Sequence, residues 1–446
     1  MRNAFRRIFI AAILLAILAC TSMADTQLTI NDVRQQAIES NRAYLSAKED
    51  VSIAQSEITR AWADALPDIS FDANYNRHFT VPSIFFVADG ETVELQTGFK
   101  NSFGAQISAR QSLWHGGKVL TALQIARLYK SYSLAVASQM EAEVLYNAER
   151  LFYSAILARA QLDLWQQALE SNTANLEVVE KLFAQGMVSE YEVLRAKVEK
   201  QNIIPRLLGA ESELRMSHKR LKSFLGIELD EAVVLVEDQT DTSIDELPSP
   251  SELTASAYAN RPEIEQAEDL AHIAQKAVRI ARADYWPSFD AVGAYTWQSA
   301  SDDFTLSNNE SSSWTAGLVV SFPIFTGGRT RGQVAWRKAQ NNQAQLNLQQ
   351  VRDDIALQVE EAYDLLIQAS EALIIQETTI AAAEEGLRIA NLRYESGVGT
   401  QLEVLSAQTA LTQAREIQAQ ALFTFRLARS GLKKATSIAL DMDTKR

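Results

Sequence analysis

The sequence contains little of what small secreted domains and most enzymes depend on. Its 446 residues include one cysteine, four histidines and eight prolines. A single cysteine cannot form an internal disulfide, so stability must come from packing or from assembly. The scattered histidines provide no metal-ligand cluster, and we expect no enzyme, metal or cofactor. The formal net charge of −14 would repel nucleic-acid phosphates, so we expect no nucleic-acid partner.

Long apolar runs are also lacking, except near the N-terminus. Three arginines precede the apolar run Ile8–Ala19, which is shorter than the about 20 residues of a transmembrane helix. A basic start, a short apolar core and small residues after it predict a signal peptide over residues 1–24. Lipid attachment at Cys20 is the alternative. No later segment could form a membrane helix, so a membrane-embedded form would be a β-barrel.

The chain contains an internal duplication. "KLFAQGMVSEYEVLRAK" at 181–197 is matched by "LRYESGVGTQLEVLSAQ" at 392–408, which is 211 residues later. Between the glycine pairs "HGGK" and "TGGR" and these motifs, the two copies have the same length. Earlier motifs, starting with "AQSEITRAWADALPD" at Ala54 and "AQKAVRIARADYWPS" at Ala274, are offset by 220 residues. A span of conserved length within one chain indicates that something physical depends on that length, and the duplication extends over nearly the whole chain after residue 24.

The duplication predicts the domain organisation. We expect a first repeat over 25–225, a linker over 226–252 and a second repeat over 253–446. Each repeat has two stretches in which apolar and polar residues alternate, at about 66–79 and 102–113 and at about 287–298 and 314–323. Such alternation over about ten residues is typical of a transmembrane strand. A hairpin half-buried on a soluble core is the alternative, but aromatic residues at the strand ends favour the membrane.

Four strands are too few to close a transmembrane sheet. The smallest single-chain barrels use eight strands, and an open sheet in lipid would leave unpaired backbone groups at several kcal/mol each. The strands must therefore be shared between subunits. A dimer would provide eight strands and a trimer twelve, and strand counting does not choose between them.

Long helices separate the strands. Residues 118–184 contain neither proline nor glycine, and a helix of about 65 residues is roughly 100 Å long. Each long helix should end at a glycine, Gly186 or Gly397. The next helix should begin at Ser189 or Thr400, each a favourable N-cap residue. A glutamate three residues further on, Glu192 or Glu403, predicts a capping box.

These motifs together resemble the TolC-like outer-membrane efflux protein family. The resemblance rests on "ANRPEIEQAE" at Ala259, "FPIFTGGRTRGQV" at Phe322 and the paired tip motifs, and it extends over nearly the whole chain after the signal peptide. It implies a mostly α fold with two repeats and a small transmembrane β part. Three copies would form a shared 12-stranded barrel that continues into a long α-helical periplasmic tunnel. The protein would be the outer-membrane exit duct of a tripartite efflux or type I secretion system.

The resemblance also implies partners and site residues. A homotrimer would sit in outer-membrane lipid of a Gram-negative bacterium, extend into the periplasm and bind a periplasmic adaptor and an inner-membrane pump of RND, ABC or MFS type. Tyr394, Glu403 and Glu192 are the periplasmic gate candidates. The adaptor-docking candidates at the tips are Gly186, Met187, Val188, Ser189, Val193, Leu194, Gly397, Val398, Gly399, Thr400, Val404 and Leu405.

Two departures bear on the gate. Gly399 stands where the well-known family member has arginine, and Ser406 where it has aspartate. Tyr394 could instead only pack between helices, and Glu403 could be only a helix cap. A secreted coiled-coil adaptor or scaffold without a pore is the rival function. It explains the helices and tips but not the four alternating strands.

Overall fold

The computed structural model describes residues 26–88, 90–237, 247–306 and 309–437. The predicted signal peptide and the lipidation candidate Cys20 lie outside these residues. The described chain divides into two compact units, and each unit draws on both repeats. The first comprises residues 26–47, 137–262 and 352–437, and the second comprises 48–136 and 263–351.

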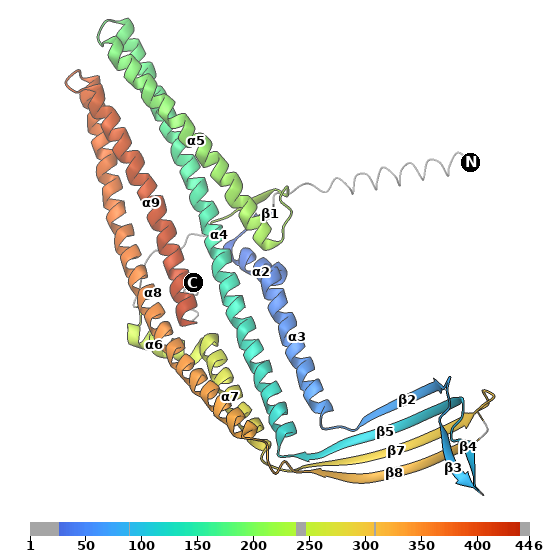
Figure 1. Cartoon of the computed structure of the whole chain (residues 1–446). Helices are drawn as coiled ribbons and strands as arrows, with labels where there is room; N and C mark the ends of the chain where they lie inside the picture. Colours follow the sequence, from blue (N-terminus) through green and yellow to red (C-terminus); the bar gives the residue numbers. More distant parts are fainter. Residues whose placement is uncertain (1–25, 89, 238–246, 307–308, 438–446) are drawn as a thin grey trace, which may run out of the picture. The chain divides into compact units, whose positions relative to one another are not determined.

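The helices repeat with the same lengths in both halves of the chain (Figure 1). Helices α4 (Lys118–Ala184) and α8 (Arg329–Glu395) each have 67 residues. Helices α5 (Glu190–Leu225) and α9 (Gln401–Thr436) each have 36. Every one of these boundaries is displaced by 211 residues between the copies. The equal spans expected from the sequence are therefore confirmed.

Before the first strand of the four-stranded sheet the chain forms two helices, α2 (Ile30–Ser40) and α3 (Arg42–Ala63). Asn41 between them has an extended backbone, and its side-chain oxygen accepts from the backbone N–H of Ala43 at 3.0 Å. This asparagine therefore starts a new helix instead of continuing the first. The second repeat has the same break at Arg261, between α6 (Pro250–Asn260) and α7 (Pro262–Ala283).

Four antiparallel strands form one sheet in the second unit, in the order β2-β5-β7-β8 (Figure 1). They are β2 (Asp68–Arg77), β5 (Asn101–His115), β7 (Ser288–Ser301) and β8 (Glu310–Ser321). All four predicted strands are present, with boundaries shifted by a few residues. Strands β2 and β8 form the two edges, and every residue of both edge strands is exposed.

The strand register sorts side chains onto two chemically different faces. Paired residues share a face in an antiparallel sheet. On one face Asp68, Ser70 and Asp72 pair with Arg110, Ser108 and Gln106. On the other, Ile69 and Phe71 pair with Ala109 and Ile107, Ile107 pairs with Tyr295, and Tyr295 pairs with Trp314. The alternation in the sequence therefore gives one apolar face and one mostly polar face, which is polar throughout β2 but includes Val292, Ala294 and Val319 in β7 and β8.

The segment between β2 and β5, to which the sequence analysis assigned no strand, contains a hairpin. Strands β3 (Ser83–Ala88) and β4 (Glu91–Gln96) pair antiparallel and form a sheet of their own. The period-two alternation of "SIFFVA" was missed because both of its faces carry apolar residues. The hairpin lies at the end of the four-stranded sheet that is far from the start of α4 (Figure 1).

A compact core holds the first unit together. Val144, Ala148 and Phe152 of α4 pack with Leu221 and Leu225 of α5 and with Val33 of α2. The short strand β1 (Thr26–Leu28) pairs in parallel with β6 (Val233–Leu235), which lies in the linker. This pairing ties the start of the described chain to the segment between the repeats. None of the described helices has both the length and the apolar character needed to span a membrane.

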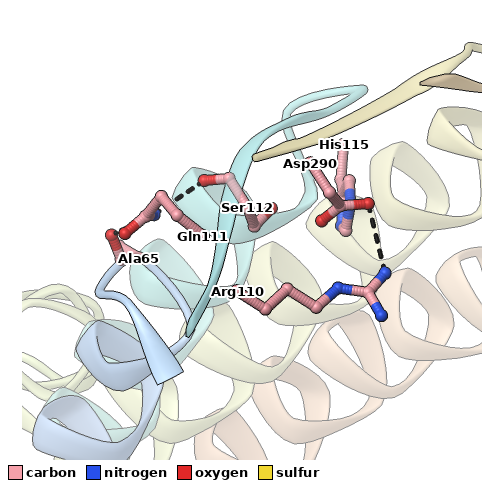
Figure 2. A network of polar contacts seen from close by, with 6 residues as sticks. All are labelled: Ala65, Arg110, Gln111, Ser112, His115 and Asp290. Atoms are coloured by element: carbon pink, nitrogen blue, oxygen red, sulfur yellow. Dashed lines mark hydrogen bonds and ion pairs between the residues drawn. The ribbon is translucent and has the colours of Figure 1, made fainter. Parts of the chain in front are cut away.

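A charged cluster fastens β5 to β7 where the sheet meets the helices (Figure 2). The buried Asp290 carboxylate accepts from the Arg110 guanidinium at 3.2 Å and lies 3.2 Å from Nε2 of His115. Next to it, the Gln111 amide donates to the backbone oxygens of Ala65 and Ser112. The cluster therefore joins the end of β5 both to β7 and to the segment that follows α3.

Asp269 on α7 predicts a measurable pH dependence of stability. Its carboxylate is buried, and one of its oxygens has no hydrogen-bond partner. Burial raises the pKa of Asp269 above the ordinary 3.8, and the negative charges of Glu265 and Glu268 raise it further. A hydrogen bond from Ser131 of α4 and the charge of His272 lower this pKa, but the net shift is upward. Because the folded pKa is raised, stability is greatest below the unfolded pKa and falls as the pH rises through the folded pKa.

Replacing Asp269 by asparagine should remove this loss. We expect the Asp269→Asn protein to unfold at a higher temperature than the native protein at pH 7. The difference should shrink as the pH is lowered toward 3.8, where the native carboxylate is protonated. Thermal unfolding followed by circular dichroism at a series of pH values measures this. A difference that is constant with pH would show that Asp269 is not the group that titrates.

Candidate functional site

The two helix tips are built on the same backbone turn. At the first tip, the N–H groups of Gly186 and Met187 donate to the carbonyls of Phe183 and Leu182. At the second, Gly397 and Val398 donate to Tyr394 and Arg393 in the same pattern. This is the Schellman motif, in which glycine takes the left-handed conformation, and φ is +74° at Gly186 and +72° at Gly397. The predicted glycine breaks are confirmed.

The second tip is closed more tightly than the first. Gly399 donates a third hydrogen bond, at 2.8 Å, to the carbonyl of Arg393. A Cβ atom at position 399 would lie 2.8 Å from the Cβ of Arg393 and 2.9 Å from its carbonyl carbon. Any larger residue would push the turn open. The glycine in place of the family's arginine is therefore part of the local fold.

The predicted capping boxes are wrong at both tips. Ser189 is an N-cap with extended backbone, but its side chain makes no capping hydrogen bond. The hydroxyl of Thr400 does accept from the backbone N–H of Glu403, at 3.3 Å. The Glu403 carboxylate, however, pairs with Arg393 Nε at 3.2 Å instead of returning to the Thr400 backbone. A guanidinium across the turn offers the carboxylate an opposite charge, which a backbone N–H does not.

Tyr394 connects the two tips. Its ring, on α8, packs against a cluster of Leu176, Val179 and Ala196 of the first tip, together with Val188 and Val193. Its hydroxyl and the Oε2 atom of Glu192 are both buried, and neither has a hydrogen-bond partner among the described residues. Burial and the negative charge of Glu192 raise the pKa of the Tyr394 hydroxyl above its ordinary value. Burying the hydroxyl and one carboxylate oxygen without hydrogen-bond partners costs free energy.

The remaining candidates divide by exposure. Met187, Leu194 and Val398 are among the exposed apolar residues, and Ser189, Gly186, Gly397 and Thr400 are exposed as well. Val404 and Leu405 are buried inside the unit. We therefore leave them out of any docking surface. Sequence reasoning missed Tyr191 and Leu402, which are exposed apolar side chains within the tip motifs.

Additional contacts hold the two helical hairpins of the first unit together below the tips. The Gln408 amide donates to the Ser171 hydroxyl at 3.1 Å, and Arg415 donates to Gln167 at 3.1 Å. Both contacts join the second repeat to the first. Within the described part of the chain, no group of three or more His, Cys, Asp or Glu residues could hold a metal ion.

Comparison with known proteins identifies the family. The family model "Outer membrane efflux protein" matches residues 33–227 and again 253–437. The chain belongs to the outer membrane efflux protein family. The resemblance, the export function and the outer-membrane location predicted from the sequence are thereby confirmed. Because the family consists of efflux proteins, the rival scaffold without a pore is set aside.

Individual relatives are distant but extend over most of this efflux protein. It is 22% identical over 398 residues to the cation efflux system protein CusC of Escherichia coli O157:H7, covering 89% of this chain and 82% of CusC. It is 25% identical to the outer membrane protein OprJ of Pseudomonas aeruginosa, covering 83% of this chain and 76% of OprJ. A crystal structure of CusC superimposes with a TM-score of 0.79 at 19% identity, covering 91% of each chain. The predicted mostly α fold with two repeats is confirmed.

Proposed function

We propose that three copies of this chain form one export duct, which an inner-membrane pump feeds through a periplasmic adaptor. The observation that carries this proposal is the four-stranded sheet with one mostly polar face, one apolar face and two exposed edges. If β8 of each copy pairs with β2 of the next, twelve strands close on themselves. The apolar face then meets lipid and the polar face lines the pore.

Aromatic side chains at both ends of the strands support a membrane position. At one end, Tyr75 and Phe103 stack at 5.0 Å, and Phe304 packs against both. At the other end, Trp114 contacts Trp286 and Phe289. Aromatic girdles at the two interfaces are characteristic of transmembrane strands, and ten strand residues span roughly 33 Å. The sheet thus has the height and the borders that a bilayer requires.

Proline substitution in an edge strand tests strand sharing. In an isolated four-stranded sheet, an edge strand tolerates proline wherever its N–H points outward. Neighbouring residues of β2 direct their N–H groups to opposite sides of the strand. In the trimer one side pairs with β5 and the other with β8 of the next copy. We therefore expect both Asp72→Pro and Ala73→Pro to abolish the assembly. Mass measurement of the native protein in detergent should give three subunits. A stable monomer, or one tolerated proline of the two, would contradict the proposal.

The tips are the proposed adaptor-docking surface. Met187, Tyr191 and Leu194 on the first tip and Val398 and Leu402 on the second are exposed apolar side chains. Surface residues of this kind in one group indicate a protein partner. Tyr394, Glu192 and Glu403 are the proposed gate. The Tyr394 hydroxyl and the Glu192 Oε2 atom are buried without partners, and the Glu403 carboxylate is held across the turn by Arg393. The pump type and the cargo depend on partners beyond this chain.

A further inference from the structure

Among the described residues of the second repeat, no strand pair corresponds to the β3–β4 hairpin. Copy one is nine residues longer than copy two between its proline and its glycine pair, and this is the interval that contains the hairpin. In the second repeat, β7 ends at Ser301 and β8 begins at Glu310. The duplicated architecture therefore does not require the hairpin. Any role of the hairpin depends on the residues that it carries.

One face of the hairpin is mostly apolar, and its one charged residue is Glu91, which pairs with Ala88 beside the turn. Ile84 pairs with Leu95, and Phe86 pairs with Val93. We call these four residues the apolar hairpin face. Each is between 39% and 52% exposed. A two-stranded hairpin is marginally stable in water by itself, so this face needs a partner that covers it.

The position of the hairpin in the chain points to a neighbouring copy as that partner. The hairpin begins at Ser83, six residues after edge strand β2 ends at Arg77. In the proposed trimer β2 lies against β8 of the next copy, so each hairpin emerges at a boundary between protomers. Threefold symmetry then brings three identical apolar faces to the same mouth of the pore.

The charge of the hairpin argues against lipid as the partner. Residues 79–99 include Asp89, Glu91 and Glu94 but no lysine or arginine. Surfaces that bind anionic headgroups are basic. Glu94 pairs with Phe85 on the opposite face, so packing of the apolar face leaves this carboxylate in water. Glu91 lies at the turn end of the apolar face, beyond Phe86 and Val93, and stays in water when it is at the border of the contact.

We propose that the apolar hairpin faces of three copies pack against one another over the outer mouth of the pore. The four side chains from each copy form an apolar constriction, which stops ions and water-soluble solutes by excluding water. It is a closure separate from the helix tips. The inference rests on the proposed strand-sharing trimer, because without that trimer the three hairpins do not meet.

Paired cysteine variants of the full-length protein test the contact. Val93 lies on the apolar hairpin face, whereas its neighbour Thr92 points to the other face of the same strand, where it pairs with Val87. The two variants are Val93→Cys and Thr92→Cys. With a short bis-maleimide added to outer membranes, we expect Val93→Cys to give cross-linked protomers and Thr92→Cys to give several times less. Both variants retain Cys20, so any contribution from that residue is the same in the two arms.

A second experiment introduces charge on either face of the hairpin and measures single-channel conductance. Phe86→Glu places three carboxylates in the constriction, whereas Phe85→Glu places them on the opposite face. We expect Phe86→Glu to raise single-channel conductance severalfold and Phe85→Glu to leave it unchanged. If all four variants remain trimeric but cross-linking and conductance do not differ between the two faces, the hairpin contact is refuted. The proposed export duct is then unaffected. A native protein that is not a trimer overturns both proposals.

Discussion

Shortening one helix tip by seven residues per helix should abolish assembly of the channel, whereas shortening both tips should be tolerated. The single change removes residues 371–377 from α8 and 418–424 from α9. The double change also removes the equivalent residues 160–166 from α4 and 207–213 from α5. Seven residues are nearly two helical turns, so each tip retracts by about 10 Å while its faces rotate by only about 20°.

The contacts between the hairpins explain the expected difference. After the single change, Tyr394 loses its place against Leu176 and Val179, and Gln408 no longer reaches Ser171. Tyr394 is partly buried, so losing this site costs less than the about 3–5 kcal/mol of a fully buried aromatic. After the double change both tips retract equally and these pairs meet again. The deleted segments contain neither the tips nor the residues of these contacts.

Two measurements check this expectation. Mass measurement in detergent reports assembly, and cellular resistance to an exported compound reports function. The double deletion serves as the matched control, because it removes twice as many residues and should nevertheless do less harm. If the single and double deletions impair the protein equally, equal helix length is not what the duplicated spacing preserves.

The architecture was accessible from the sequence because it depends on periodicity and length. Long segments without proline or glycine, glycine breaks at a fixed offset and period-two strands are each properties of many residues together. The equal helices α4 and α8 and the four-stranded sheet followed from them. Local features such as helix breaks depend on single residues, which periodicity does not reveal. Asn41 breaks one helix into two by a local hydrogen bond. In the second repeat Pro262 marks the same break, but the first repeat has Arg42 at this position and no proline signal.

The chemistry of the tips was less accessible, since it depends on contacts across a turn. Glu403 was expected to complete a capping box, because it stands three residues after Thr400. Arg393, ten residues earlier, takes the carboxylate instead. The sequence shows both residues, but only the Schellman turn and the close approach at Gly399 bring them together. This geometry decides whether the Glu403 carboxylate binds the backbone N–H of Thr400 or the Arg393 guanidinium.

The pair also changes what is expected of the channel mouth. Glu403 alone would give a trimer a ring of three negative charges, and acidic rings favour cations. Arg393 supplies an equal number of positive charges at 3.2 Å, so the ring is largely neutralised while this ion pair is formed. The two members of the pair should therefore affect ion selectivity in opposite directions.

Arg393→Gln should increase the preference for cations, and Glu403→Gln should reduce it. A charge about 10 Å from an ion contributes about 0.4 kcal/mol in water, so three contribute about 1 kcal/mol and change the permeability ratio by roughly fivefold before salt screening. The exposed ion pair itself contributes less than about 1 kcal/mol to stability, so both variants should assemble. Reversal potentials in planar bilayers under a salt gradient measure the ratio. The double variant is the control and should lie between the single ones; if both substitutions leave the ratio unchanged in an intact trimer, the pair is a structural clamp of the tip and does not contribute to the pore.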